Sequence, residues 1–228
     1  MSKPTRIALV GASGLIGMSL IRMAVGRPDI RIIAIARSEL RLPPGARMDV
    51  LLADPSGWGD AIAAVNADVL VCALGTTWKK AGKDEAVFRA VDQDLVLACA
   101  RAAKAAGVRQ MITVSSVGAD PMTKNFYLKV KGETEQALGK VGLTRLDILR
   151  PGLLRGPREE RRLAEKLAMI ASPVADLLLH GKYRKYRSIR ADALAQAIVG
   201  LTREAMAGRF VFEHDAILRA ARKGQSIL

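Results

Sequence analysis

Near its N-terminus the chain reads Ile7-Ala8-Leu9-Val10-Gly11-Ala12-Ser13-Gly14-Leu15-Ile16-Gly17, and this stretch decides the fold. The apolar run from Ile7 to Val10 predicts a buried parallel strand, and helical spacing begins after the second glycine. Gly11 permits a tight turn, Gly14 lets the backbone approach a pyrophosphate, and Gly17 lets the helix pack close to the sheet. The pattern predicts a dinucleotide-binding turn, although small residues at these positions also serve simple packing of a helix on a strand.

Strand and helix patterns alternate along the chain, which predicts an α/β fold with a parallel sheet. We expect strands near residues 7–10, 31–36, 48–52, 68–72, 110–115, 145–149 and 210–212. We expect further helices near residues 59–65, 84–106, 126–138, 159–170 and 191–204, and a tail after residue 212. The chain is expected to be one domain, with a core over residues 1–152 and a small substrate lobe with the last strand over residues 153–228.

Composition indicates a folded protein with an aliphatic core, because 50% of the residues are hydrophobic and 4% are aromatic. The apolar runs are short and interrupted by charge, so we expect no transmembrane helix and no membrane partner. No signal peptide is predicted, and Cys72 and Cys99 are expected to be buried thiols, so the prediction is a cytoplasmic protein. His180 and His214 are the chain's two histidines, without a Cys/His cluster, and no metal site is expected.

The formal net charge is +14, and basic residues are dense from Arg155 to Arg190. Such a region is typical of a nucleic-acid or membrane-surface patch, or of a solvated basic face with a few arginines for an anionic cofactor. Aromatic residues interleave with the basic ones only between Lys182 and Arg187, which is a small footprint for nucleic acid. We therefore favour the solvated face, and nucleic acid is not expected as a partner.

Ligands of an open α/β sheet bind outside the carboxyl ends of its strands, so the residues at those ends matter most. The second strand ends at Arg37-Ser38, twenty residues after Gly17. A basic residue there suits the 2′-phosphate of NADP, whereas an acidic residue would suit the ribose of NAD. The fourth strand ends in Leu74-Gly75, which lets an adenosine pass close to the backbone.

The fifth strand ends in Ser115-Ser116, and Tyr127 and Lys131 follow at a spacing of four residues. Residues i and i+4 share one helix face, and a lysine ammonium beside a phenol favours the phenolate. That arrangement suits a tyrosine that gives or takes a proton during hydride transfer to or from a nicotinamide. Taken alone, such a pair more often belongs to a helix surface. Its place after a Ser-Ser strand end favours catalysis.

These residues resemble a short-chain dehydrogenase/reductase, in which a glycine motif, a serine and a Tyr-xxx-Lys pair occur in this order. Several runs further resemble the Tat-interactive protein family of atypical short-chain dehydrogenases. They are Val71–Thr77, Val114–Asp120, Tyr127–Glu133, Leu149–Gly152 and Glu213–Ile217. One departure is Asp92, which stands where many family enzymes have an Asn that completes a proton relay.

The resemblance implies a Rossmann-type doubly wound parallel sheet that binds NADPH. It places the pyrophosphate at Ser13, Gly14, Leu15 and Ile16, the 2′-phosphate at Arg37 and Ser38, and the adenosine at Leu74 and Gly75. It places the nicotinamide ribose at Tyr127 and Lys131, with Pro151 and Arg158 beside the cofactor. It assigns Tyr127 as general acid/base, Lys131 as its modulator, and the second serine of the pair, Ser116, as the catalytic serine.

Two functions follow from these observations. The favoured one is an NADPH-dependent oxidoreductase that acts on a small carbonyl or alcohol substrate. The alternative is a regulatory or protein-interaction protein that binds NADPH with little or no turnover. Apolar residues between Met169 and Leu179 are typical of a substrate pocket, of ordinary core or of a homodimer face.

Overall fold

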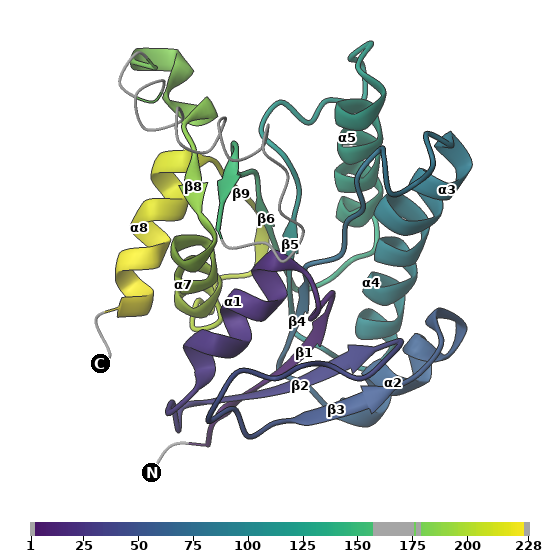
Figure 1. The fold of residues 1–228 in the computed structure, drawn as a ribbon, viewed down its shortest axis with the longest axis vertical. Coiled ribbons are helices and arrows are strands. Elements are labelled where there is room, and N and C mark those ends of the chain that lie inside the picture. Colours follow the sequence, from purple (N-terminus) through teal and green to yellow (C-terminus); the bar gives the residue numbers. More distant parts are fainter. Residues whose placement is uncertain (1–2, 157–175, 177–178, 226–228) are drawn as a thin grey trace.

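The computed structural model describes residues 3–156, 176 and 179–225. Among these residues, seven strands form one parallel sheet in the order β3-β2-β1-β4-β5-β6-β9 (Figure 1). The strands are β1 (Thr5–Val10), β2 (Ile30–Ala36), β3 (Asp49–Leu52), β4 (Val69–Cys72), β5 (Gln110–Val114), β6 (Arg145–Leu149) and β9 (Gly208–Phe212). The strand order reverses between β1 and β4, which confirms the doubly wound Rossmann-type sheet and fixes its ligand-binding crevice.

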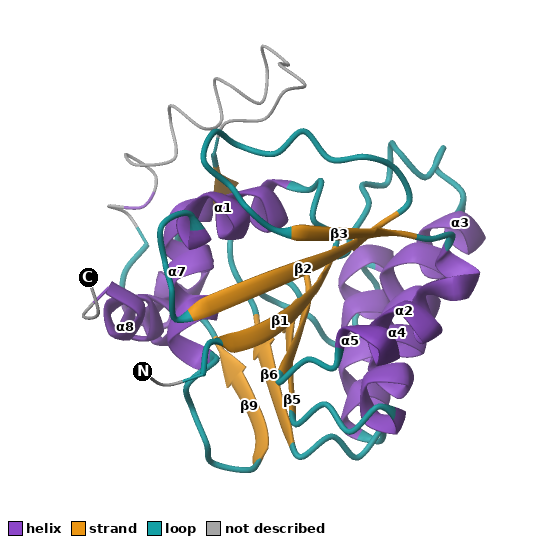
Figure 2. Cartoon of the chain, turned by 90° about the horizontal axis from the view of Figure 1, so that it is seen from below, coloured by secondary structure: helices purple, strands orange, loops and turns teal. Residues whose placement is uncertain are grey.

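Helices cover both faces of the sheet. They are α1 (Leu15–Ala24), α2 (Trp58–Val65), α3 (Glu85–Arg89), α4 (Leu95–Ala105), α5 (Phe126–Gly139), α7 (Ala191–Leu201) and α8 (His214–Gln225). Figure 2 shows α1, α7 and α8 on one side of the sheet and α2, α4 and α5 on the other. Short 3-10 turns occur at η1 (Pro55–Gly57) and η3 (Gly181–Tyr186), and β7 (Leu154–Arg155) pairs with β8 (Ile189–Arg190) in a second, two-stranded sheet.

The first strand shows why the sheet needs two helical layers. Ile7 and Leu9 belong to the core cluster that α1, α7 and α8 cover, whereas Ala8 and Val10 belong to the cluster under α2, α4 and α5. All four side chains are fully buried. A strand that is apolar on both faces must be covered on both faces, and this is typical of parallel sheets.

One prediction was wrong at the C-terminus, where the expected tail is helix α8. Its buried residues Ile217, Ala220, Ala221 and Gly224 recur at helical spacing and face α7. The two helices approach closely, since a Cβ at Gly200 would lie 2.3 Å from the Ala220 carbonyl oxygen. The expected helix over residues 159–170 lies outside the described residues.

The helix expected over residues 84–106 is present, but it contains a local change of winding. The α-helical turns α3 and α4 are joined by η2 (Ala90–Asp94), a π-helical turn. Asp92 lies within this turn and is buried. Turns of this kind are rare inside α-helices and are frequent at functional sites.

Candidate functional site

A cavity of about 1180 Å³ lies across the carboxyl ends of β1, β4 and β5, at the reversal of strand order. It is the expected place for a ligand of an open α/β sheet. The glycine turn lines it through Ser13, Gly14, Leu15 and Ile16, and the loop after β4 lines it from Ala73 to Lys80. The far wall contains Asp92, Ser115, Tyr127 and Lys131. One cavity therefore joins the predicted pyrophosphate turn to the predicted acid/base pair.

The glycine turn is shaped by contacts that a side chain would prevent. Gly11 has φ +82°, and a Cβ there would lie 2.5 Å from the carbonyl carbon of Ala73. A Cβ at Gly17 would lie 2.4 Å from the Gly11 carbonyl oxygen. The two glycines lie beneath the cavity and do not line it, so their role is to bring the turn, α1 and β4 together.

The start of α1 suits an anion. Its N-cap is Gly14, which supplies no capping side chain, and its first turn contains no acidic residue. The exposed Ser13 and Gly14 border the cavity at this end of the helix. The first N–H groups of a helix and its positive dipole end bind phosphates well. These residues therefore fit the pyrophosphate of a dinucleotide.

Helix α5 presents three ionisable groups along one face, because Tyr127, Lys131 and Glu135 follow at intervals of four residues. The helix begins at Asn125, whose side chain accepts a hydrogen bond from the N–H of Leu128 (3.0 Å). Tyr127 is 38% exposed, whereas Lys131 and Glu135 are buried. The Lys131 ammonium lies 6.0 Å from the centre of the Tyr127 ring.

The Lys131 ammonium is paired with a buried carboxylate. Its Nζ lies 2.7 Å from Asp92 Oδ1, and Asp92 Oδ2 accepts a hydrogen bond from the N–H of Thr76 (2.7 Å). Burial alone would lower the pKa of Lys131, but the charge of Asp92, aided by Tyr127, outweighs it and raises that pKa. The π-helical turn thus connects the cavity wall after β4 to the lysine of α5.

A second buried network lies at the ends of β5 and β6. Ser115 Oγ donates to Glu135 Oε1 (2.5 Å), and Arg150 donates to both oxygens of Glu135, with Nη2 2.5 Å from Oε2. The strand register places Val114 beside Leu149, so Ser115 and Arg150 leave adjacent strands at the same level. The network fixes Ser115 in the cavity wall.

Aromatic rings border the reacting end of the cavity. Trp78 lines the cavity and packs against Phe126 and Phe88, with ring centres 5.2 Å and 6.3 Å apart. Phe88 in turn packs against Tyr127 at 5.8 Å. The rings hold the Tyr127 side chain in place while leaving part of it accessible.

The structure brings together some, but not all, of the residues predicted from the sequence. Those that line the cavity are Ser13, Gly14, Leu15, Ile16, Leu74, Gly75, Tyr127 and Lys131. Those that are described but do not line it are Gly11, Gly17, Arg37, Ser38, Ser116 and Pro151. Ser116 is half-buried, and its Oγ lies 3.4 Å from the carbonyl oxygen of Val117. Arg158 lies outside the described residues.

Several residues of the site were not predicted. Arg22 and Arg41 line the cavity, the first on the outer face of α1 and the second beyond Arg37. Glu135 contacts Ser115, and its spacing of four residues after Lys131 was a signal available in the sequence. Asp92 was noted in the sequence at the position of the family's relay Asn, but its direct ion pair with Lys131 was not predicted, because it depends on packing between α5 and the π-helical turn.

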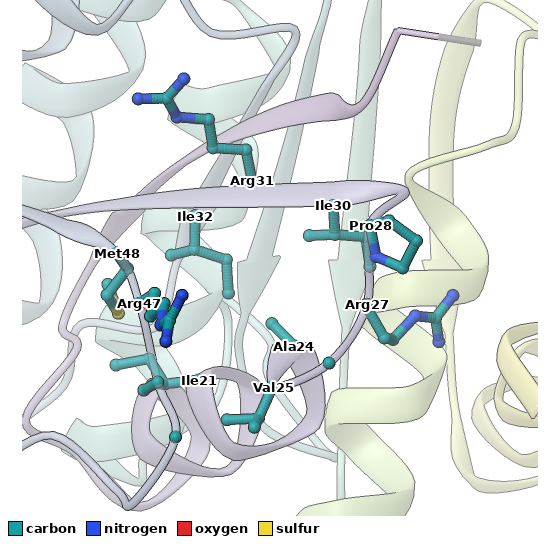
Figure 3. Close-up of a pocket in the computed structure, with 13 residues that line it drawn as sticks. Ile21, Ala24, Val25, Arg27, Pro28, Ile30, Arg31, Ile32, Arg47 and Met48 are labelled. Carbon is teal, nitrogen blue, oxygen red and sulfur yellow. The ribbon is translucent and has the colours of Figure 1, made fainter. Parts of the chain in front are cut away.

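A second cavity of about 850 Å³ lies between the end of α1, the start of β2 and the loop before β3 (Figure 3). Figure 3 shows Arg31 and Ile32 on opposite faces of β2. Among the described residues that line this cavity, the ionisable side chains are Arg27, Arg31 and Arg47. It lies away from the carboxyl ends of the strands and has no proton-transfer group, so we do not assign the chemistry to it.

Comparison with known proteins agrees with this geometry. The model of a family described as NAD(P)H-binding matches residues 11–205. The chain is 31% identical over 209 residues to the protein fmp52 of Emericella nidulans, covering 89% of each chain. It is 37% identical over 153 residues to FMP52 of Saccharomyces cerevisiae, covering 66% of each. These relatives carry the name Fmp52 and not that of the Tat-interactive protein.

Among solved structures, the UDP-glucose 4-epimerase of Thermus thermophilus, in complex with NAD, is similar in fold. The TM-score is 0.68 at 19% identity, and the match covers 96% of this chain and 83% of that one. The likeness extends the fold assignment beyond the glycine turn to the whole sheet.

The comparisons also correct one prediction. Both fungal relatives are named as mitochondrial proteins, which contradicts the expectation of a cytoplasmic protein. Within the described residues, none of the helices has the length and apolar character needed to cross a membrane.

Proposed function

The chain belongs to the family of NAD(P)H-binding proteins, and on this basis we propose that it is an NADPH-dependent oxidoreductase of the short-chain dehydrogenase type. We propose a small carbonyl or alcohol compound as its substrate. The observation that carries the proposal is the single cavity that joins the glycine turn to Tyr127 and Lys131. If the glycine turn served only to pack a helix on a strand, the half-exposed Tyr127 phenol at the other end of the same cavity would have no role.

The residues divide the work as follows. The cofactor, when bound, supplies or accepts the hydride. Tyr127 gives a proton to the carbonyl oxygen of the substrate, or takes it from the alcohol in the reverse direction. Lys131 lies in the wall where it can donate to the cofactor ribose while Asp92 holds its ammonium in place. The backbone at Leu74 and Gly75 borders the adenosine.

A preference for NADPH is supported by basic residues near the end of β2. Arg37 and Ser38 are exposed at the end of that strand, and Arg41 follows in the cavity wall. Arg22 lines the same cavity from α1. Guanidinium groups bind phosphates with paired hydrogen bonds, so this set suits the 2′-phosphate despite Glu39 in the same wall.

Binding without turnover is the second candidate, and one observation favours it. The Asp92 carboxylate lies 2.7 Å from Lys131 Nζ, so the ammonium is already paired with an opposite charge and is less available to the reacting end of the cavity. A protein that only senses NADPH would tolerate such a pair.

The test begins with calorimetry of NADPH and NADH binding to the purified protein. We expect tight binding with preference for NADPH. A panel of small aldehydes and ketones is then screened for NADPH oxidation with the native chain, Tyr127→Phe and the matched control Tyr183→Phe. Turnover that is lost in Tyr127→Phe and kept in Tyr183→Phe supports the oxidoreductase. NADPH binding without any turnover supports the second candidate, and no binding of either nucleotide refutes both.

A further inference from the structure

The buried network of Ser115, Glu135 and Arg150 determines which way the Ser115 hydroxyl points. Glu135 is 2% exposed and accepts two close hydrogen bonds from the Arg150 guanidinium. An ionised carboxylate accepts hydrogen bonds and donates none. Ser115 Oγ lies 2.5 Å from Glu135 Oε1, so the Ser115 proton must point at Glu135. A serine has one proton, and what Ser115 can offer to the cavity is therefore a lone pair.

We propose that Glu135 positions Ser115 as a hydrogen-bond acceptor in the cavity, so that the site prefers a substrate hydroxyl over a carbonyl oxygen next to Ser115. The inference rests on the proposed function and deepens it by naming the substrate group. It also selects Ser115, which lines the cavity, over Ser116, which does not. Ser115 contacts the substrate directly, whereas Glu135 acts through Ser115 and is a positioning residue.

The preference follows from pairing of donors and acceptors. In the bound alcohol the O–H donates to the lone pair of Ser115, and the alcohol oxygen accepts from the Tyr127 hydroxyl. When the alcohol is oxidised, the same O–H must turn from Ser115 to Tyr127, which then takes the proton. A carbonyl oxygen at the same place still accepts from Tyr127, but it faces the lone pair of Ser115 with another lone pair. Ser115, which is buried, is then left without a donor on its cavity side. An unpaired buried polar group is costly, so the alcohol should be favoured.

The variant Glu135→Gln is expected to turn Ser115 from a hydrogen-bond acceptor into a hydrogen-bond donor toward the cavity. Arg150 Nη2 and Arg209 Nη2 lie nearest Oε2, at 2.5 Å and 3.8 Å. Arg150 Nε lies 2.9 Å from Oε1 and 3.2 Å from Oε2, so it can donate to an oxygen at either place. We therefore expect the amide oxygen of the glutamine at the Oε2 place, which puts its NH₂ beside Ser115. Ser115 then accepts from the glutamine and turns its proton toward the cavity.

The experiment measures the affinities of cyclohexanol and cyclohexanone for the NADP⁺-loaded protein by ligand-observed NMR titration. The native chain should bind the alcohol roughly tenfold more tightly, the ratio that about 1.4 kcal/mol produces. Glu135→Gln should lose or invert this ratio, and Ser115→Ala should abolish it. Glu133→Gln is the matched control, because Glu133 lies two residues earlier on α5 and pairs with Arg89 instead (2.6 Å). Its ratio should equal that of the native chain.

If Glu135 had only a structural role, Glu135→Gln would lower thermal stability but leave the ratio of cyclohexanol affinity to cyclohexanone affinity unchanged. Equal affinities in the native chain, a preference for the ketone, or no binding of either probe would overturn the proposal. So would a change in Glu133→Gln as large as that in Glu135→Gln. Failure of the proposed function is seen separately, as absence of NADP⁺ binding by the native protein. If Glu135→Gln does not fold, the loss of preference in Ser115→Ala decides the question alone.

Discussion

Lys131 and Asp92 form an ion pair within the wall of the cavity, with Nζ 2.7 Å from Oδ1 and exposed side-chain fractions of 8% and 1%. The pair joins two elements that are 39 positions apart in sequence numbering, α5 and the π-helical turn η2. Asp92 also accepts from the N–H of Thr76, so the loop after β4 is held by the same carboxylate. The side chain of Asp92 therefore holds both the loop after β4, which lines the cavity, and helix α5, which carries Tyr127 and Lys131.

Asp92→Asn should lower the free energy of unfolding by about 3 kcal/mol, because it leaves a buried charge without its partner. Burial would then lower the pKa of Lys131 instead of the raised pKa of the native pair. In the native chain the stabilisation is present at neutral pH and is lost as pH rises through the raised pKa of Lys131. Chemical denaturation at neutral pH measures the loss in Asp92→Asn, and a series extended above pH 10.5, the ordinary pKa of lysine, follows the loss in the native chain.

The double variant Asp92→Asn with Lys131→Met serves as the control for this prediction. It removes both charges and should recover most of the lost stability. A double variant no more stable than Asp92→Asn would show that the ion pair is not the cause. Glu133→Gln breaks a half-exposed pair on the same helix and should cost less than about 1 kcal/mol.

Gly17→Ala should abolish nucleotide binding and destabilise the fold, because its Cβ would lie 2.4 Å from the carbonyl oxygen of Gly11. Backbone atoms cannot yield as a flexible side chain can, so the turn must move. Gly59→Ala is the matched control within a helix, since its Cβ would meet Ala102 at an ordinary 3.8 Å. It should be neutral or stabilise by up to about 1 kcal/mol. Equal losses of NADPH affinity in both variants would contradict the role of Gly17.

The sequence predicted the sheet well because its central strands are continuous apolar runs that need cover on both faces. The glycine turn and the Tyr127–Lys131 spacing were also readable, since each depends on neighbours within one element. Helix α8 was missed although its apolar residues recur at helical spacing, because charged and polar residues interrupt them over this short segment.

The polar contacts between side chains of different elements in the site could not be predicted from the sequence. Asp92 lies in a π-helical turn that the sequence does not indicate, and from there it pairs with Lys131 of α5. Ser115 and Arg150 reach the same carboxylate, Glu135, because the register of β5 and β6 places them at one level, and the sequence does not state this register. The choice between Ser115 and Ser116 likewise depends on which side chain the strand end turns into the cavity.

Arg41→Glu and Arg37→Glu should each weaken NADPH binding roughly tenfold more than NADH binding, because hydrogen bonds to a charged phosphate are worth about 1.5–3 kcal/mol. Arg41 lines the cavity, and Arg37 directly follows β2 outside the cavity wall, at the place proposed for the 2′-phosphate. Calorimetry with the two nucleotides measures the difference. Arg31→Glu is the control, since Arg31 lies on β2 but pairs with Asp49 (2.9 Å). If NADH binding suffers equally, the arginine in question does not bind the 2′-phosphate.

Asp29→Asn should destabilise the chain at neutral pH, and the difference from the native chain should vanish in acid. Hydrogen bonds from Arg27 and then Arg203 lower the pKa of Asp29 from 3.8 to about 2. They tie the start of β2 to the end of α7, with Arg203 Nη2 2.5 Å from Asp29 Oδ2. A carboxyl with a lowered pKa stabilises the fold above its unfolded pKa, and this contribution is lost as pH falls through the folded value.

The expected loss in Asp29→Asn is therefore constant above about pH 5, shrinks below about pH 4 and is gone near pH 2. Its size should be about 1 kcal/mol, since the partly exposed pair is screened by water, and this corresponds to a fall in Tm of about 2–4 °C. Thermal unfolding across this pH range is the measurement. Asp49→Asn is the control, because Asp49 pairs with Arg31 in an exposed position and should change stability by less than about 0.5 kcal/mol. A deficit in Asp29→Asn that persists unchanged at pH 2 would mean that lost packing, and not the charge, is responsible.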